Sequence, residues 1–289
     1  MKVGIYGYIK SEAQEYVEIL LECLDSYNIE TVIENNFYES IDVKKTYQTF
    51  SDYSDLNSSY DLLFTLGGDG TFLRAVTFVR DSNIPILGIN MGRLGFLATI
   101  QKENIRSSIR SLIDKKFSIK ERSLLTVKAS KKNIDLEEIN FALNEITVAR
   151  RNTTSMITVK TYLDDEYLTS YWADGLIVAT PTGSTGYSLS CGGPVINPGA
   201  KSLVLTPIAP HNLNARPLVI PDDIEIKLKV TGREKQALIS LDSRTSVIDN
   251  ETEILIKRAP FTIKTIQLKE QTFFKTLREK LLWGEDKRN

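Results

Sequence analysis

The sequence predicts an α/β domain built on a parallel sheet, then an all-β sandwich domain and a C-terminal helix that packs back on the first domain. Strand-like runs alternate with amphipathic helical stretches up to residue 118, as in a parallel sheet covered on both faces. Short strand-like runs separated by turn signals then continue to residue 266 with little helical periodicity. The tail regains helical spacing. The predicted domains are therefore residues 1–118, 119–266 and 267–289.

Each element of the first domain has its own signal. An apolar run that ends abruptly in glycines, for example, precedes a helix-compatible stretch. The alternation is typical of a Rossmann-like sheet. The predicted elements are a strand at 3–8, a helix with Ala13, Val17, Leu20, Leu21 and Leu24 on one face, a strand at 31–34, a loop at 51–60, a strand at 61–66, a helix at 71–80, a strand at 85–90 and a helix with Ile105, Ile109, Leu112 and Ile113 on one face.

The second half of the chain carries strand signals throughout. Its predicted strands lie at residues 123–130, 142–150, 156–165, 175–180, 202–210, 224–230, 236–242 and 252–259. In the tail, Phe273, Leu277, Leu281 and Leu282 recur at three- and four-residue steps, and such a helix needs an apolar partner.

Composition excludes several classes of protein. Hydrophobic residues at 42% and charged residues at 25% match an ordinary globular chain. The 36 basic and 37 acidic residues leave a net charge of −1, so no nucleic-acid partner is expected. The single histidine, His211, argues against most zinc enzymes and against a histidine-based triad. Cys23 and Cys191 cannot build a disulfide framework or a four-cysteine metal site, and they fit a reducing compartment.

The sequence also predicts where the protein works. No segment approaches the roughly 20 apolar residues that cross a bilayer, and the N-terminal residues do not read as a signal peptide. We therefore expect a cytoplasmic protein with no membrane partner.

The segment FTLGGDGTFLRA, residues 64–75, is the most informative part of the chain. Glycines at a strand-to-helix turn let the backbone approach a ligand closely, and the helix N-terminus offers free N–H groups to a phosphate. Asp69 lies at the carboxyl end of this strand, where open α/β sheets bind ligands. It could take a proton from an attacking hydroxyl or help hold a divalent cation. From these residues alone, a tight turn in which Asp69 caps the helix at Thr71 is the simpler alternative.

A second polar segment is the pair Asn144 and Glu145 within a strand pattern. Consecutive strand residues face opposite sides, so both can touch one ligand only at a strand end or a bulge. Together they offer donors and acceptors suited to ribose hydroxyls or a base edge. A solvated polar pair is the alternative.

The third segment spans residues 173–199, and its centre at 182–190 packs hydroxyls and glycines into a predicted loop. Hydroxyls and backbone amides can hold sugar, base and phosphate oxygens, while Tyr187 offers a ring. Asp174 stands just before a strand and could accept from an amide or a hydroxyl. A purely structural loop is the alternative.

Together these segments resemble the NAD kinase family, the enzymes that phosphorylate NAD to NADP. GGDGTFLRA, the NE pair and DGLIVATPTGSTGYSLSCGGPVINP stand in that family's order and approximate spacing, and LGINMGRLGFL at residues 87–97 is also similar. The resemblance extends from Asp61 to about Pro221, while the first sixty residues match only in pattern. The third segment is highly specific, whereas GGDG alone is shared with lipid kinases and phosphofructokinases.

The resemblance implies phosphorylation of the 2′-hydroxyl of the adenosine ribose of NAD, with ATP as co-substrate and a divalent cation, Mg²⁺, bridging its phosphates. Asp69 is the implied catalytic residue, accepting the proton of that hydroxyl. The implied binding residues are Gly68, Asp69 and Gly70 near the pyrophosphate, Arg74 as a cationic phosphate contact, Asn144 and Glu145 at the ribose and adenine, Asp174 at the nicotinamide end, Thr185, Gly186, Tyr187, Ser188, Leu189 and Ser190 around adenine and ribose, Ala209 in the same pocket, and Arg244.

The sequence departs from the family at a few positions. TGY at residues 185–187 stands where the family often has TAY, and Cys191 stands where alanine is common; both are swaps of small residues. Arg244 ends a DSR turn where the family often shows a DGQ-like one, which leaves its contact open. Trp172 lies where some members carry a basic residue, so the choice between NAD and NADH also stays open.

The mechanism implied by the resemblance fits the composition. With one histidine in the chain, a carboxylate is the natural base, although an unperturbed aspartate pKa near ~3.9 makes it a weak one. A loose phosphoryl-transfer transition state needs little base strength, so Asp69 would orient the hydroxyl more than it abstracts the proton. No cluster of protein ligands for a metal is predicted, and the cation is expected on the ATP phosphates.

Other classes fit less well. Lipid kinases place a G-T-x-N-D-like segment soon after the turn, where this chain has NMGRLGFL. A non-catalytic dinucleotide sensor would have no use for Asp69 in a phosphate loop, and a dehydrogenase would show GxGxxG after its first strand. The resemblance further implies a homo-oligomer, a tetramer, built through the β-rich half, whose exposed sheet edges need covering.

Overall fold

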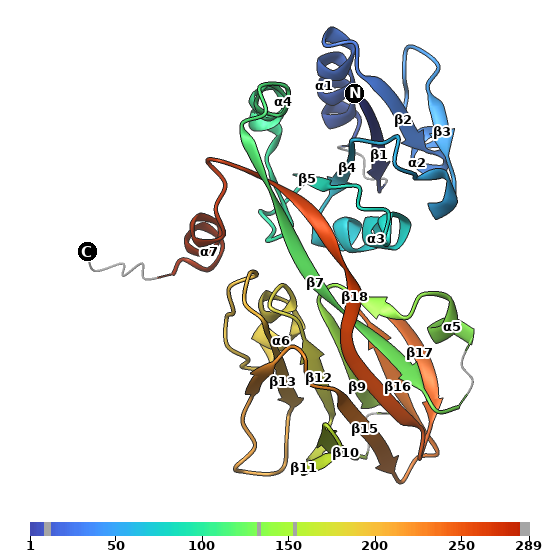
Figure 1. The fold of residues 1–289 in the computed structure, drawn as a ribbon, viewed down its shortest axis with the longest axis vertical. Coiled ribbons are helices and arrows are strands. Elements are labelled where there is room, and N and C mark those ends of the chain that lie inside the picture. The colour runs from blue at the N-terminus through green and yellow to red at the C-terminus, as the bar shows by residue number, and fades with distance from the viewer. Residues whose placement is uncertain (9–12, 132–133, 153–154, 284–289) are drawn as a thin grey trace. The chain divides into compact units, whose positions relative to one another are not determined.

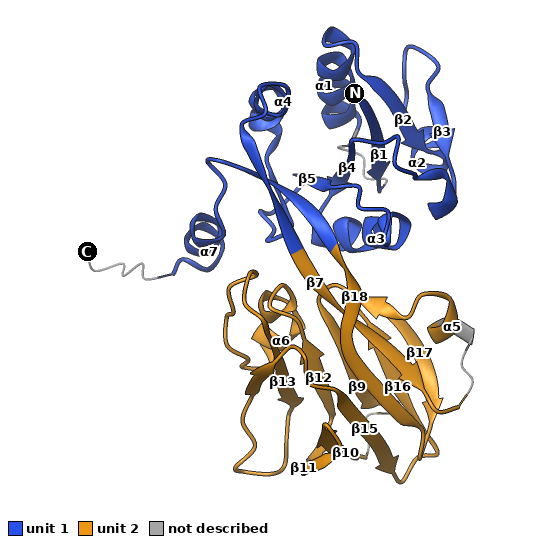
Figure 2. Cartoon of the chain, viewed as in Figure 1, with its two compact units in different colours: residues 1–121, 263–289 blue, residues 122–262 orange. Residues whose placement is uncertain are grey.

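The computed structural model describes residues 1–8, 13–131, 134–152 and 155–283. The chain divides into two compact units, residues 1–121 with 263–289, and residues 122–262 (Figure 2). Strands β7 (Phe117–Ala129) and β18 (Glu253–Leu268) contribute residues to both units. The domain limits drawn from the sequence stay a prediction.

The first unit is built on a parallel sheet with the strand order β3–β2–β1–β4–β5 (Figure 1). The chain order reverses between β1 and β4, which is the topological switch point of a Rossmann-like sheet. The predicted α/β fold class is therefore confirmed. The elements before β7 are β1 (Lys2–Gly7), α1 (Ala13–Ser26), β2 (Glu30–Glu34), α2 (Asn35–Glu39), β3 (Gln48–Phe50), the 3-10 helix η1 (Tyr53–Asp55), β4 (Leu62–Gly67), α3 (Asp69–Val79), β5 (Ile86–Asn90), β6 (Ala98–Ile100), the 3-10 helix η2 (Lys102–Asn104) and α4 (Ile105–Ile113).

Helices cover this sheet through the apolar faces that the sequence predicts. Val17 and Leu20 of α1 share one buried core with Ile105 and Ile109 of α4 and with strands β1 and β4. Helix α3 packs against β4 and β5, and its Phe72 side chain is buried. The periodicity of each helix thus fixes which side chains meet the sheet.

The second unit is an antiparallel β-sandwich. One sheet has the order β14–β13–β12–β9–β16–β17, and its inward apolar residues share a core with those of β10, β15 and β18. Val148 and Val178 come from the first sheet, and Val159 and Leu228 come from the second. The predicted sandwich is confirmed. Its elements after β7 are α5 (Ile134–Glu138), β8 (Phe141–Ala142), β9 (Glu145–Arg150), β10 (Ile157–Leu163), β11 (Glu166–Ala173), β12 (Gly175–Ala179), the 3-10 helix η3 (Gly183–Thr185), α6 (Tyr187–Ser190), β13 (Ser202–Ile208), β14 (Leu218–Pro221), β15 (Ile226–Gly232), β16 (Gln236–Leu241) and β17 (Arg244–Asp249).

The segment at residues 182–190 differs from the predicted loop, because it forms η3 and α6. Its hydroxyls close the turns themselves: Ser184 Oγ donates to the Pro181 carbonyl at 2.7 Å, and Thr185 Oγ1 donates to the Thr182 carbonyl at 3.1 Å. Short-range bonds of this kind compete with an open loop. The expectation of an irregular loop was wrong for that reason.

The C-terminal helix α7 (Phe273–Leu281) belongs to the first unit. Thr272 caps it, accepting from the Lys275 amide at 3.2 Å. Before the helix, Gln271 bonds the Thr99 hydroxyl at 2.8 Å and the Thr99 carbonyl at 3.2 Å. The helix therefore packs back on the first unit, as the sequence predicts. Over the described ranges of the chain, none of the helices combines the length and the apolarity needed to span a membrane.

Candidate active site

The GGDG turn joins β4 to α3 at the carboxyl edge of the parallel sheet. Gly67 has a φ of +153°, and a Cβ there would stand 2.1 Å from Thr71 Oγ1, so only glycine fits. At Gly68 and at Gly70, an added Cβ would meet no described atom within 4 Å. The turn thus leaves open space beside the N-terminus of α3, where free N–H groups favour an anion.

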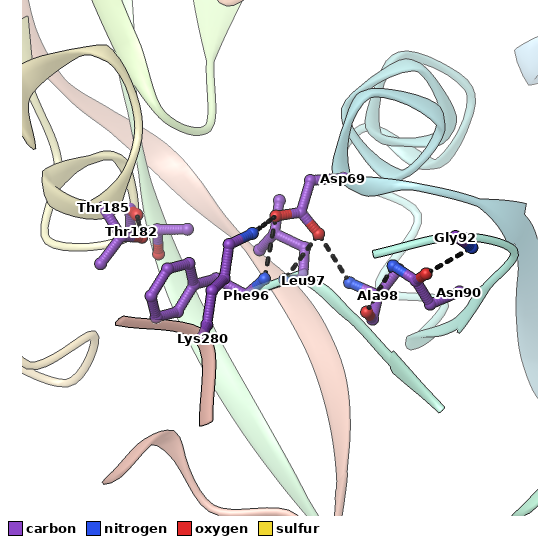
Figure 3. Close-up of polar contacts among 9 residues, drawn as sticks. All are labelled: Asp69, Asn90, Gly92, Phe96, Leu97, Ala98, Thr182, Thr185 and Lys280. Atoms are coloured by element: carbon purple, nitrogen blue, oxygen red, sulfur yellow. Dashed lines mark hydrogen bonds and ion pairs between the residues drawn. The ribbon is translucent and has the colours of Figure 1, made fainter. Parts of the chain in front are cut away.

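Asp69 is held by backbone amides from outside the turn (Figure 3). Its Oδ2 accepts from the Phe96 amide at 2.9 Å, and its Oδ1 accepts from the amides of Leu97 and Ala98 at 3.0 Å each. The N-cap of α3 is Gly68, which offers no side chain. The alternative in which Asp69 merely caps the helix at Thr71 is therefore wrong, because its carboxylate bonds the segment after β5 instead.

That segment, residues 91–98, is shaped to bring its amides to Asp69. Asn90 ends β5, and its side chain accepts from the Gly92 amide at 2.7 Å and donates to the Ala98 carbonyl at 3.2 Å (Figure 3). A Cβ on Gly95 would stand 2.0 Å from Asp69 Oδ1. Gly95 is therefore required for the close approach, which gives the LGINMGRLGFL segment a physical role.

Two cationic side chains near the GGDG turn, those of Lys280 and Arg74, have different partners. Lys280 of α7 places its Nζ 3.8 Å from Asp69 Oδ2, and the same Nζ stands 5.0 Å from the centre of the Phe96 ring. The Arg74 guanidinium, the phosphate contact implied by the resemblance, lies 5.0 Å from the centre of the Tyr8 ring. Lys280 was not predicted.

In the second unit, Asn144 and Glu145 stand at the start of β9, the strand end that lets both reach one ligand. Below them, Asp242 accepts from three consecutive amides: Leu143 at 3.0 Å, Asn144 at 2.8 Å and Glu145 at 3.2 Å. Asp242 has a φ of +53° in the turn between β16 and β17. Burial raises its pKa, while the three amides and Arg244 act in the opposite direction.

Two glycines of the third segment, Gly183 and Gly186, pack directly on this pair. A Cβ on Gly183 would stand 2.1 Å from the Asn144 carbonyl oxygen, and one on Gly186 would stand 2.9 Å from Glu145 Oε2. The backbone N–H of Tyr187 also bonds the Glu145 carboxyl group. The structure therefore brings the second and third segments together within one unit.

Among the described residues, two buried side-chain oxygens of this cluster have no hydrogen-bond partner. Asn144 Oδ1 and Glu145 Oε2 are buried and bond to no described residue. Buried polar atoms are rarely left unpaired, because each unmade bond costs about 1–3 kcal/mol. Burial, reinforced by the Asp242 carboxylate, raises the pKa of Glu145 to about 8. The pair therefore offers a neutral carboxyl group and an amide to a ligand, and the solvated-pair alternative does not fit its burial.

Most hydroxyls of the third segment are used internally. Ser188 is fully buried, and its Oγ lies 2.8 Å from Thr206 Oγ1. Thr180 Oγ1 donates to the Leu143 carbonyl at 2.6 Å and accepts from the Gly183 amide at 3.1 Å. The Tyr187 ring, in contrast, is 46% exposed. The hydroxyls support the cluster, and Tyr187 remains a surface that a ligand could contact.

The remaining predicted residues of the second unit have partners of their own, and Asp174 and Ala209 lie toward the end of β12 that is opposite Glu145. Asp174 forms an ion pair with Arg150 at 2.9 Å. Ala209 is exposed, has a φ of +43°, and follows the residue whose carbonyl accepts from the Asp174 amide. The Arg244 guanidinium donates to the carbonyl of Ile139 at 2.9 Å and to that of Phe141. Arg244 therefore supports the chain leading into β9. Thr185, Leu189 and Ser190 lie in η3 and α6, and their ligand roles stay predictions.

A Rossmann-like unit with an acidic glycine turn, together with a sandwich that buries an Asn–Glu pair, defines a nucleotide-binding protein of the phosphotransferase type. The ATP-NAD kinase N-terminal domain model matches residues 8–117, and the ATP-NAD kinase C-terminal domain model matches residues 143–268. The chain belongs to the NAD kinase family.

The chain is similar to curated NAD kinases over the whole length of each. The chain is 58% identical to the NAD kinase of Christiangramia forsetii and 56% identical to that of Flavobacterium psychrophilum, with 100% of both chains covered in each comparison. Among solved structures, yeast NADH kinase complexed with NADH matches with a TM-score of 0.88 at 25% identity, covering 99% of this chain and 88% of that one. An NAD kinase from Archaeoglobus fulgidus in complex with ATP matches with a TM-score of 0.75 at 26% identity, covering 98% and 99%.

Proposed function

We propose that this chain transfers the γ-phosphoryl group of ATP to the 2′-hydroxyl of the adenosine ribose of NAD, giving NADP. The observation that carries the proposal is Asp69, a carboxylate fixed by three amides in a glycine turn at a helix N-terminus. Full-length relatives named NAD kinase support the same reaction.

Asp69 acts on the hydroxyl through Oδ2. A carboxylate oxygen has two main acceptor directions, and Oδ1 uses both on the amides of Leu97 and Ala98. Oδ2 accepts only the Phe96 amide at hydrogen-bond distance among the described residues, so it keeps a direction for the 2′-hydroxyl. Because the amides hold the carboxylate rigidly, its main contribution is to orient the hydroxyl, and it takes the proton as the phosphoryl group transfers.

Asn144 and Glu145 bind the adenosine part of NAD in this proposal. Their unpartnered atoms, Asn144 Oδ1 and Glu145 Oε2, would be satisfied by a ribose hydroxyl and an adenine amino group. With a pKa of about 8, the Glu145 carboxyl group is largely protonated at pH 7, so it can donate as well as accept. Tyr187 supplies a ring for packing, and Asp174 and Ala209 keep the roles implied by the resemblance.

The phosphoryl donor is ATP carried with a divalent cation. Among the residues that the structure describes, no group of three or more His, Cys, Asp or Glu side chains could hold a metal ion. Mg²⁺ in phosphoryl-transfer sites usually keeps several waters and binds substrate phosphates with one or two carboxylates. We propose that it enters on the ATP phosphates and neutralises their charge.

We further propose that the protein works in the cytoplasm as a homotetramer. Both cysteines are free, which suits a reducing compartment. Edge strand β14 exposes Leu218 and Val219, at 36% and 48%, and an exposed apolar edge favours pairing with a second copy.

The test is a reaction of the purified chain with NAD, ATP and MgCl₂, followed by a dehydrogenase that accepts only NADP. NADP should form with all three present and should not form when any one is omitted. Replacing NAD by NADH measures the preference that the sequence leaves open. Phosphorylation of diacylglycerol without NADP formation would overturn the proposal.

A further inference from the structure

Lys280 lies on the side of α7 that carries its buried residues, and is itself partly exposed. Phe273, Thr276, Leu277 and Lys280 fall three, four and seven residues apart, which places them on one side of a helix. Thr276 and Leu277 on this face are buried, at 7% and 8% exposure. The helix that packs on the first unit therefore carries a lysine on its packing side, where an apolar residue would be expected.

Several contacts hold α7 and the residue before its cap against residues 96–99. Residues 96–98 donate their amides to Asp69. The Phe273 and Phe96 rings are 6.2 Å apart between centres, and the two Gln271–Thr99 hydrogen bonds fix the start of the helix. The position of the Lys280 ammonium is thus coupled to that of the Asp69 carboxylate.

The contact between the two charges leaves the ammonium available. Its Nζ stands 3.8 Å from Asp69 Oδ2, within ion-pair range but beyond a hydrogen bond, and the Lys280 side chain is 34% exposed. An ammonium has three N–H donors, and one flank faces the Phe96 ring at 5.0 Å. Lys280 can therefore bind another anion while remaining beside Asp69 (Figure 3).

A carboxylate at a phosphoryl-transfer site creates an electrostatic problem, because it repels the phosphoryl group that must approach the hydroxyl it orients. In the proposed reaction the ribose 2′-oxygen attacks the γ-phosphorus of ATP, the bond to the β,γ-bridging oxygen breaks, ADP leaves and the hydroxyl proton passes to Asp69. A cation next to Asp69 Oδ2 offsets this repulsion and stabilises the charge on the equatorial phosphoryl oxygens.

We propose that Lys280 is a catalytic residue of this reaction, binding the γ-phosphoryl group of ATP through its ammonium. The inference rests on the proposed function and adds a phosphate contact to it. Arg74, whose guanidinium lies over the Tyr8 ring, does not contact Asp69 in the described structure. Lys275 provides a matched comparison, because it lies on the exposed side of α7, 3.9 Å from Glu279.

The test compares Lys280→Met, which keeps an unbranched apolar stem without the charge, with Lys280→Arg and with the control Lys275→Met. At saturating NAD, Lys280→Met should lower kcat/KM for ATP about tenfold to a hundredfold, as expected for loss of a charge-assisted hydrogen bond. Lys280→Arg should recover part of the loss, and Lys275→Met should match the unaltered chain. Calorimetry should give an NAD dissociation constant within twofold in all variants. Lys280→Gln replaces the methionine variant if that variant does not fold.

Binding of Mg·ATP without NAD, measured by calorimetry, separates this inference from the proposed function. Unaltered kinetics and ATP affinity in Lys280→Met would overturn the role of Lys280 and leave NADP formation standing. If the unaltered chain makes no NADP, the proposed function fails, and the ATP affinity then decides the inference: weaker binding in Lys280→Met than in Lys275→Met supports the phosphate contact, and equal binding refutes it.

Discussion

Asp69 and Asp242 make the same kind of backbone contact, each within its own unit. Each carboxylate accepts three consecutive backbone amides, those of residues 96–98 and those of residues 143–145. A carboxylate with three N–H donors has one favoured orientation, and in return it fixes the backbone that supplies them. The amides fix the carboxylate of Asp69, which we propose orients the ribose hydroxyl, and Asp242 fixes the backbone of Asn144 and Glu145.

Replacing Asp69 by asparagine tests both its role in the reaction and its hydrogen bonds to the amides of residues 96–98. An amide of the same shape cannot satisfy all three donors, because its NH₂ group would face a backbone N–H. We expect Asp69→Asn to lower kcat at least a hundredfold and to reduce the free energy of unfolding by about 1–3 kcal/mol. The NAD dissociation constant should stay within a few-fold. Exposed Asp81→Asn is the control, and unchanged turnover in Asp69→Asn would remove Asp69 from the mechanism.

Glu145 is tested by a matched pair of substitutions. Glu145→Ala removes a buried hydrogen-bonding group, so NAD should bind about tenfold to a hundredfold more weakly. Glu145→Gln should remain within a few-fold, since a carboxamide can donate and accept as a neutral carboxyl group does. Calorimetric titration with NAD measures both. Equal affinity in Glu145→Ala and the unaltered chain would contradict the ligand role of this pair.

The raised pKa of Glu145 also predicts a pH dependence of stability. An unfolded glutamate loses its proton near pH 4.5, while the folded chain keeps it up to about pH 8. Between these values the folded state binds more protons, so the contribution of Glu145 makes the free energy of unfolding fall as pH rises, by at most about 1.4 kcal/mol per unit. Urea denaturation between pH 5 and 8 should show a shallower fall in Glu145→Gln. Identical slopes would contradict the raised pKa.

At the scale of elements, short segments far apart in sequence come together within each unit. In the first unit, the segment at residues 91–98 and helix α7 surround the end of β4. In the second, residues 183–187 close over the start of β9. Glycines permit each close approach, because a Cβ would overlap the atoms that these segments meet.

Gly95 and Gly92 offer a matched test of that packing within one segment. A Cβ on Gly95 would stand 2.0 Å from Asp69 Oδ1, whereas one on Gly92 would meet no described atom within 4 Å. Gly95→Ala should therefore displace the carboxylate and lower kcat about a hundredfold, as a misplacement near 1 Å does. Gly92→Ala should remain close to the unaltered chain. Comparable rates in the two variants would show that the packing of residues 91–98 does not set the position of Asp69.

At the scale of the whole molecule, the sandwich leaves sheet edges to be covered. Strands β14 and β17 end one sheet, and Val219 and Val247 are exposed on them at 48% and 39%. Edge strands with exposed apolar residues favour association. The homotetramer is the form that the family resemblance implies.

Light scattering tests the assembly directly. We expect a mass of four chains of 32.6 kDa at micromolar concentration, and we expect Val219→Lys, which puts a charge on the β14 edge, to shift the mass toward smaller species. Lys201→Glu, an exposed change just before β13, is the control. A mass of one chain for the unaltered protein would refute the tetramer.

The sequence by itself determined the two fold classes, the GGDG turn after β4, the Asn–Glu pair within a strand pattern and the family. These features rest on local spacing: helical and strand periodicity fix the buried faces, and glycines at a strand-to-helix turn mark a ligand site. Only the tertiary structure decided that Asp69 bonds residues 96–98, that Asp242 holds residues 143–145, and that Lys280 stands beside Asp69. Those contacts join residues about 27 to 211 positions apart, and no local spacing specifies which distant amide or ammonium a carboxylate will meet. In the sequence, the one sign of Lys280 was a charged residue on the packing side of α7. Its role could be inferred only from its position beside Asp69.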